Sequence, residues 1–133
     1  MKPKELKEYI NTSLEEGESL VGYFLAQQMN IWLYLIIGPL AAFTLKHYYV
    51  AVSDRGIHFH RMSMMNKVAN SDFFTFDDIK NVKIGKGMLQ RPMRFQFESG
   101  RSIKFKAQLK GVKSVPKLTD EIQSHIESKV ERA

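Results

Sequence analysis

YYVAVSDRGIHFHR, at residues 48–61, has the sequence pattern of a β-hairpin. Val50 and Val52 alternate with other side chains before the turn signal, and Ile57 and Phe59 alternate with two histidines after it. Pairing Val52 with Ile57 and Val50 with Phe59 puts the apolar side chains on one face of the hairpin. The four intervening residues, SDRG, then predict a type I turn closed by a glycine in the left-handed conformation.

Strand patterns continue along the chain from this hairpin. Period-two segments follow at residues 72–76 and 80–84, and a second hairpin is predicted from residues 93–98 and 102–107. Strands are therefore expected to dominate the chain from about residue 19 to residue 107. The fold class that this predicts is mainly β, with helices only at the two ends.

The register of the second hairpin follows from the requirement that each face be consistent. A two-residue loop would place polar side chains opposite apolar ones, so it is rejected. A three-residue loop at residues 99–101 sets Phe95 against Phe105 and keeps the inner face apolar. On the outer face the same register predicts that Arg94 lies opposite Lys106.

Helical spacing is found at both ends of the chain. Residues 1–17 contain apolar side chains four positions apart, which predicts a short amphipathic helix that packs on the rest of the molecule. Residues 115–131 carry apolar side chains every three or four positions, and Ser114 is the expected N-cap. The predicted organisation is this N-terminal helix followed by one domain, residues 18–133, which includes the C-terminal helix.

Length and composition narrow the class of protein. A chain of 133 residues is enough for one domain with its own core. The chain has no cysteine, which excludes disulfide scaffolds, thiol nucleophiles and thiolate metal sites. The absence of an apolar stretch among the charged first residues argues against a secretory signal, so a cytoplasmic location is expected.

The positive charge is concentrated in one part of the chain. The formal net charge is +6, and residues 79–118 contain eleven Lys or Arg residues against Glu98 alone. A surface built only for stability would place acids among these cations, because like charges on opposite strand positions are destabilising. We therefore expect an anion-binding face, with a solvated lysine-rich sheet surface as the alternative. The expected face comprises Lys83, Arg94, Lys104 and Lys106.

An uncharged run, IWLYLIIGPLAAFTL, occupies residues 31–45. Fifteen residues of helix are about 22 Å long, too short for a bilayer core of about 30 Å, and Pro39 interrupts the run. A buried core segment is the favoured interpretation, and a segment that dips into a membrane is the alternative. Trp32 is the candidate membrane-contact residue under that alternative.

The sequence carries no motif typical of catalysis or of phosphate binding in nucleotide-dependent enzymes. His58 and His60 alternate along one strand and could offer two nitrogen ligands, but a zinc site needs at least a third. We therefore expect an exposed histidine pair, no metal, no cofactor and no enzymatic activity.

The order of these elements resembles that of the bacterial pleckstrin-homology-like (PH-like) domain family. The resemblance is carried by YYVAVSDRGIHF, by FTFDDIKNVKIGKGM at residues 74–88, and by RFQFESGRSIKFK before the closing helix. It implies a bent antiparallel β-barrel of about seven strands, capped by a C-terminal helix and used for binding or assembly. Phosphoinositide-binding members of the wider superfamily carry basic residues in the loop after the first strand, whereas residues 25–45 here contain none.

Two expectations about function follow from the charge pattern and the resemblance. The first is a non-enzymatic binding or scaffold module that uses the basic face for an anionic lipid surface, peripheral at the inner face of the membrane. The alternative is a cytoplasmic module that binds an acidic protein or forms a homo-oligomer. Nucleic acid is a weaker partner, because Phe95, Phe97 and Phe105 point inward in the predicted register and leave no exposed aromatics to stack on bases.

Overall fold

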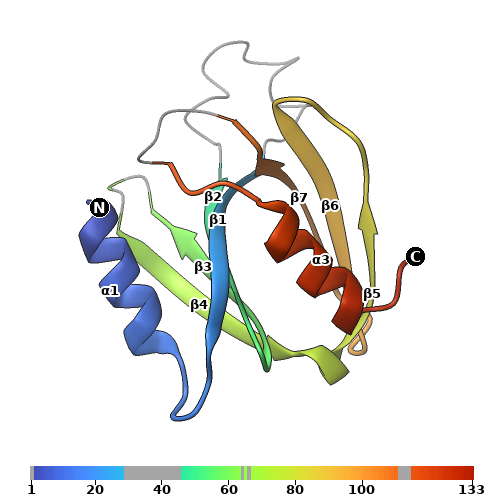
Figure 1. Ribbon diagram of the computed structural model, residues 1–133, viewed down its shortest axis with the longest axis horizontal. Coiled ribbons are helices and arrows are strands. Elements are labelled where there is room, and N and C mark those ends of the chain that lie inside the picture. The colour runs from blue at the N-terminus through green and yellow to red at the C-terminus, as the bar shows by residue number, and fades with distance from the viewer. Residues whose placement is uncertain (1, 29–45, 64, 66, 111–114) are drawn as a thin grey trace.

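The computed structural model describes residues 2–28, 46–63, 65, 67–110 and 115–133 of the chain. Seven antiparallel strands form one curled sheet, a half-barrel, with a short helix near each end of the chain (Figure 1). In the sheet the strands follow the order β4-β3-β2-β1-β7-β6-β5. The elements are α1 (Pro3–Ser13), β1 (Leu20–Gln28), β2 (Lys46–Ser53), β3 (Gly56–Met62), β4 (Val68–Thr75), the 3₁₀ turn η2 (Phe76–Asp78), β5 (Ile79–Ile84), β6 (Gln90–Phe97), β7 (Ser102–Gln108) and α3 (Asp120–Lys129). The predicted mainly-β fold with a helix near each end is confirmed.

The first hairpin, β2–β3, has the predicted register. Val52 pairs with Ile57 and Val50 with Phe59, and all four side chains are buried. The predicted left-handed glycine at the turn is wrong, because Gly56 does not have a positive φ. Gly56 is required there for space: a Cβ atom on it would lie 2.1 Å from the carbonyl oxygen of Phe74 on the neighbouring strand β4.

The second hairpin, β6–β7, is shifted by two residues from the predicted register. Phe95 pairs with Ile103 and not with Phe105, and Arg94 pairs with Lys104 and not with Lys106. The reason is the loop: a three-residue loop places its third residue in the left-handed region, and Gly100 takes this position with φ 92°. The predicted loop would have put an arginine there. A shift of two preserves the faces of both strands, so the inward phenylalanines stay inward.

The core lies on the concave side of the sheet and is closed by α3. Apolar side chains of α3 and its flanking residues pack against inward residues of the strands; they are Leu118, Ile122, Ile126 and Val130. Helix α1 covers the opposite, convex side, where Leu6 and Ile10 pack against Ala51. Figure 1 shows the two helices on opposite sides of β1.

The predicted C-terminal helix over residues 115–131 is too long at its N-terminal end. The helix begins at Asp120, and its N-cap is Thr119, whose hydroxyl oxygen accepts a hydrogen bond of 3.2 Å from the backbone N–H of Ile122. Ser114, the predicted N-cap, lies outside the described residues. The segment before Thr119 is held by the sheet, since the carbonyl of Pro116 accepts from the N–H of Leu25 at 3.0 Å. In addition, Pro116 disfavours the helical conformation for the residue that precedes it.

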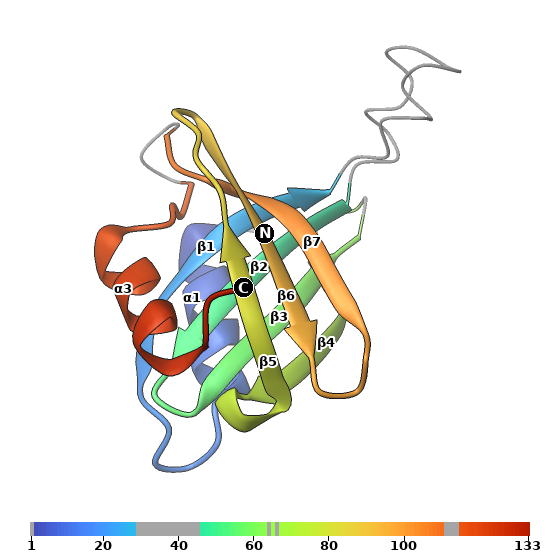
Figure 2. The ribbon, with the colours of Figure 1, turned by 90° about the vertical axis from the view of Figure 1, so that its right-hand side faces the viewer.

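The end of the described chain protects one edge of the sheet. Val82 of β5 donates its N–H to the carbonyl of Glu131 and accepts from the N–H of Ala133, both at 2.9 Å. Figure 2 shows the C-terminus lying beside β5. This pairing covers backbone groups that an edge strand would otherwise offer to other chains.

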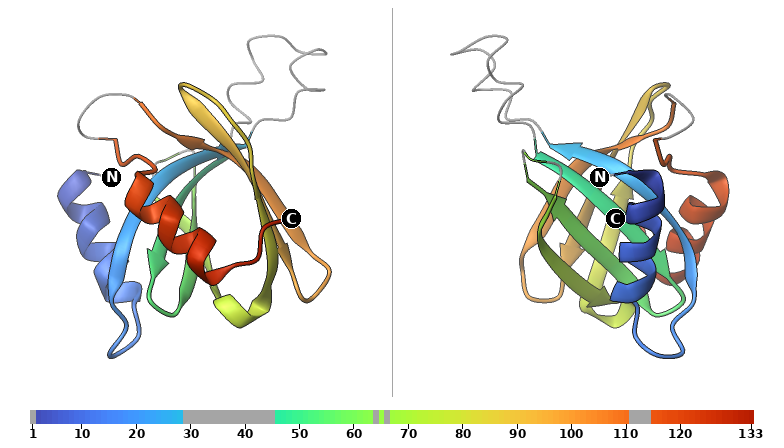
Figure 3. Two further views of the ribbon diagram at one scale, coloured as in Figure 1. Left: turned by 45° about the vertical axis from the view of Figure 1, so that its right-hand side comes forward. Right: turned by 90° about the vertical axis from the view of Figure 1, so that its left-hand side faces the viewer.

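The two halves of the sheet meet between β1 and β7. Within the described residues these strands pair at Ala26 with Ala107 and at Gln27 with Lys106. The two views in Figure 3 show the two groups of strands curling toward each other around the core. The uncharged run at residues 31–45, with Trp32, lies outside the described residues.

Candidate functional site

Three of the four predicted anion-binding residues form a line across neighbouring strands. Lys83 of β5 pairs with Arg94 of β6, which pairs in turn with Lys104 of β7. All three side chains are exposed on the convex side, because their neighbours along each strand face the core. Directly paired residues have Cβ atoms about 5 Å apart, so the Cβ atoms of the three residues lie within about 10 Å of one another. We call these three residues the basic row.

Lys106, the fourth predicted residue, lies beside the basic row and not within it. It pairs with Pro92 of β6 and with Gln27 of β1, two positions along β7 from Lys104. Its side chain is exposed on the same convex face. The structure therefore brings all four predicted residues onto one face. Arg94 and Lys106, which were predicted to lie opposite each other, do not pair.

The basic row has no acidic neighbour to neutralise it. Among the described residues, none of Lys83, Arg94 and Lys104 takes part in an ion pair. The remaining residues of the chain contain no Asp or Glu, so they supply no partner either. Like charges at paired strand positions destabilise the sheet by a few tenths of a kcal/mol per pair. The row is thus an uncompensated cationic surface that an external anion would stabilise.

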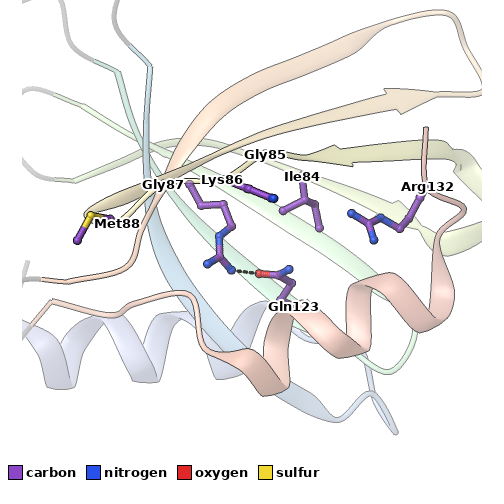
Figure 4. A pocket seen from close by; sticks show the side chains of 8 residues that line it. Ile84, Gly85, Lys86, Gly87, Met88, Gln123 and Arg132 are labelled. Carbon is purple, nitrogen blue, oxygen red and sulfur yellow. Dashed lines mark hydrogen bonds between the residues drawn. The ribbon is translucent and has the colours of Figure 1, made fainter.

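A second cationic feature lies on the concave side of the same strands. A cavity of about 620 Å³ opens between the β5–β6 hairpin and α3. Figure 4 shows Ile84, Gln123 and Arg132 directed toward the space between the hairpin and the helix. The lining residues are Ile84, Gly85, Lys86, Gly87, Met88, Arg91, Gln123 and Arg132. We call this space the hairpin pocket.

The charge of the hairpin pocket comes from three separate parts of the chain. Lys86 belongs to the β5–β6 turn, Arg91 to β6, and Arg132 to the segment that pairs with β5. The guanidinium of Arg91 donates a hydrogen bond to the side-chain oxygen of Gln123 on α3. One acid is nearby: Glu127 lies 3.8 Å from the guanidinium of Arg132 and accepts from the side-chain amide of Gln123 at 2.7 Å. Three cations and one carboxylate leave the pocket region positive.

Sequence reasoning missed the hairpin pocket for identifiable reasons. Lys86 and Arg91 belong to the basic block, but strand parity assigns Arg91 to the core side, where an arginine was not expected. Arg132 approaches them only because the last residues pair with β5. The one feature of the sequence that could have indicated the pocket was an arginine at an inward-facing strand position, since a cation on the core side requires a partner.

His58 and His60 are buried, so the predicted exposed histidine pair is wrong. Their exposed fractions are 5% and 0%, because Tyr9 of α1 packs against the ring of His60 and the ring of His58 stacks on Phe73 of β4. His58 lies 2.8 Å from the carboxylate of Glu18, and the ring of His60 lies 2.7 Å from the hydroxyl of Ser71. Within the described residues no group of three or more potential ligands is placed to hold a metal ion.

Glu18 is the centre of this buried polar cluster. Its carboxylate accepts from the backbone N–H of Glu15 at 2.9 Å and from the hydroxyl of Ser53, and it contacts His58. Burial acts to raise the pKa of Glu18, but the hydrogen bonds and the histidine outweigh it, so the pKa is lowered below its usual value of 4.5. The carboxylate is therefore held in its charged form.

The combination of serine, histidine and glutamate does not form a nucleophilic triad. In such triads the histidine lies between the acid and the serine, whereas here Glu18 contacts both Ser53 and His58. The Ser53 oxygen also accepts from the backbone N–H groups of Arg55 and Gly56, each at 3.2 Å. Ser53 is fully buried. The cluster joins the segment after α1 to the β2–β3 hairpin and has a structural role.

Comparisons with known proteins bear on the fold. No protein-family model matches the sequence, and no curated protein matches it. Among solved structures, the hSac2 domain from the human phosphoinositide phosphatase Sac2 is similar, with a TM-score of 0.56 and 13% sequence identity. The match covers 94% of this chain and 76% of that chain. The likeness supports the curled antiparallel sheet with its C-terminal helix, and at this identity it shows the fold alone.

Neither α1 nor α3, nor any other helix in the described ranges, is long and apolar enough to cross a membrane.

Proposed function

We propose that this protein is a non-enzymatic binding module that associates with an anionic membrane surface through its basic row. The observation that carries the proposal is the line of Lys83, Arg94 and Lys104 on three paired strands, with no acid to neutralise it. An exposed array of cations attracts a surface of anionic head groups, and each well-placed cation contributes about 1 kcal/mol of attraction. Lys106 extends the same face toward β1.

The proposal includes membership of the bacterial PH-like family and a cytoplasmic location at the inner face of the membrane. The three segments that resemble the family lie on β2–β3, on η2–β5 and on β6–β7, and the helix α3 follows the last of them. The aromatic residues of β5, β6 and β7 are Phe95, Phe97 and Phe105, and all three are buried, so these described strands offer no exposed ring to stack on bases and nucleic acid is disfavoured.

The test compares charge reversals on two faces. Arg94→Glu with Lys104→Glu should weaken co-sedimentation with phosphatidylserine-containing vesicles by at least about 2 kcal/mol, or about thirtyfold. Lys4→Glu with Lys7→Glu changes the net charge equally on the exposed side of α1 and serves as the control. The difference between the two variants should shrink as salt is added, because exposed charges are screened.

Two outcomes would contradict the proposal. If the wild-type protein binds anionic and neutral vesicles equally, an anionic membrane surface is not its partner, and an acidic protein is favoured instead. Equal weakening by the two double variants would mean that only the net charge matters, and the basic row would then be an ordinary solvated surface.

A further inference from the structure

The tip of the β5–β6 hairpin combines features that the basic row does not explain. Met88 is 80% exposed and the adjacent Leu89 is 66% exposed, and they are two of the three large apolar side chains most exposed among the described residues. The turn that presents them is tight: a Cβ atom on Gly87 would lie 1.8 Å from the carbonyl oxygen of Gln90. Leu89 is further held by its carbonyl, which accepts from the N–H of Leu109 at 3.0 Å.

The apolar tip lies at the rim of the hairpin pocket. Met88 itself lines the pocket, together with Lys86 of the same turn (Figure 4) and Arg91 at the start of β6. The third strongly exposed apolar residue, Met65, belongs to the β3–β4 connection, which is a different hairpin. Exposed apolar side chains beside a cationic cavity therefore occur together at one place in the described structure.

This combination matches the chemistry of an anionic phospholipid. The phosphate of such a lipid is a compact anion that arginine and lysine bind through charge-assisted hydrogen bonds. The chains of the lipid begin within a few ångströms of that phosphate, where apolar side chains at interfacial depth are stabilised. A pocket of about 620 Å³ is within the range of sites that hold small ligands.

We propose that the hairpin pocket binds the head group of an anionic phospholipid while Met88 and Leu89 enter the interfacial layer of the membrane. This inference rests on the proposed function, and it adds a head-group site on the concave side to the attraction exerted by the basic row. Arg91, Arg132 and Lys86 line the pocket and supply the cations that bind the phosphate. Glu127 opposes binding, because its carboxylate lies beside Arg132.

The charge arm of the test uses single neutral substitutions. Arg91→Gln should weaken binding to phosphatidylserine-containing vesicles about fivefold, the factor that one cation near an anionic membrane supplies. Arg101→Gln removes the same charge from the exposed β6–β7 turn and should have a much smaller effect. Arg91→Lys should restore most of the binding. Glu127→Gln should strengthen binding, which a merely structural role for this residue would not produce.

The second part of the test replaces the exposed apolar side chains of the hairpin tip and uses an exposed methionine elsewhere as the control. Met88→Ser with Leu89→Ser should weaken vesicle binding about tenfold through loss of interfacial burial. Met65→Ser removes an equally exposed methionine from the β3–β4 connection and should leave binding unchanged. Melting temperatures of the Met88, Leu89 and Met65 variants should stay close to that of the wild type, because these side chains are exposed and contribute little to the core.

The outcomes separate this inference from the proposed function. If wild-type protein does not prefer anionic vesicles, the proposed function fails and the inference fails with it. If the basic-row variants weaken binding but Arg91→Gln equals Arg101→Gln, only the head-group site is overturned. If inorganic phosphate shifts the NMR signal of the Gln123 side-chain amide while the Met88 and Leu89 variants bind vesicles normally, the pocket is a site for a soluble anion, and the lipid assignment is wrong.

Discussion

Acidification between neutral pH and about pH 5 should destabilise this protein through one buried histidine. His60 is fully buried under α1, with its ring 2.7 Å from the Ser71 hydroxyl and in edge contact with Tyr9. Burial, together with the nearby charge of His58, lowers the pKa of His60 from its usual 6.5 to about 4. The native state therefore keeps His60 neutral at a pH where the unfolded chain takes up a proton.

The sign and size of the effect follow from these two pKa values. Above 6.5 the ring is neutral in both states and has no influence on stability. As the pH falls from 6.5 toward 4, only the unfolded state gains the proton, so the free energy of unfolding decreases. The loss is about 2 kcal/mol at pH 5 and about 3 kcal/mol at pH 4. Glu18, whose lowered pKa stabilises the native state above 4.5, adds its own loss only below that pH.

The assay is urea denaturation of the wild type and of His60→Gln near pH 7 and near pH 5. Glutamine can keep a hydrogen bond to Ser71 but does not titrate, so the variant should lose about 2 kcal/mol less stability between the two conditions. The comparison concerns the change with pH, so a lower stability of the variant at neutral pH does not affect it. Equal losses in both proteins would refute the reasoning.

Three further substitutions test the fold. Ile126→Ala, at a fully buried position of α3, should cost about 2–5 kcal/mol in urea denaturation, and a loss below 1 kcal/mol would mean that α3 does not close the core. Gly100→Ala should cost roughly 1–2 kcal/mol from backbone strain alone, since its Cβ would meet nothing within 4 Å; no change in melting temperature would contradict the left-handed turn. Thr119→Ala should cost about 1 kcal/mol by loss of the N-cap, whereas Ser124→Ala in the helix interior should cost nothing measurable.

The sequence patterns predicted the faces of the strands better than their pairing. Alternation assigned Val50, Phe59 and Phe95 to the core correctly, because side chains alternate between the two faces along a strand whatever its pairing partner is. The β6–β7 register required knowing which residue takes the left-handed loop position, and Gly100 was placed one position too early in the loop. The register shift gave Arg94 a different partner on β7, but it left every side chain on its predicted face. Lys83, Arg94 and Lys104 therefore lie together on one face, as predicted.

Other features could not be predicted because they depend on contacts between distant segments. The spacing of His58 and His60 gives no sign that α1, Glu18 and Phe73 bury them, and a lone strand with alternating histidines is consistent with exposure. The start of α3 is set by the pairing of Pro116 with β1, which local helical spacing does not reveal. The hairpin pocket likewise needs Arg132 beside β5.

The position of β1 in the sheet divides the molecule into two parts that can form separately. Apart from the β1–β7 pair, every strand pairs only with its neighbours in the chain, so β1–β4 and β5–β7 are two meanders built from local contacts. The pairing of Ala26 with Ala107 joins the two groups by closing a long loop. Such contacts form late, because the chain loses the entropy of loop closure before the new contacts can stabilise it. We therefore expect the two meanders to fold first and to dock afterwards. A chain cut at η2 would leave both meanders whole, and its two fragments should reassemble without a covalent link.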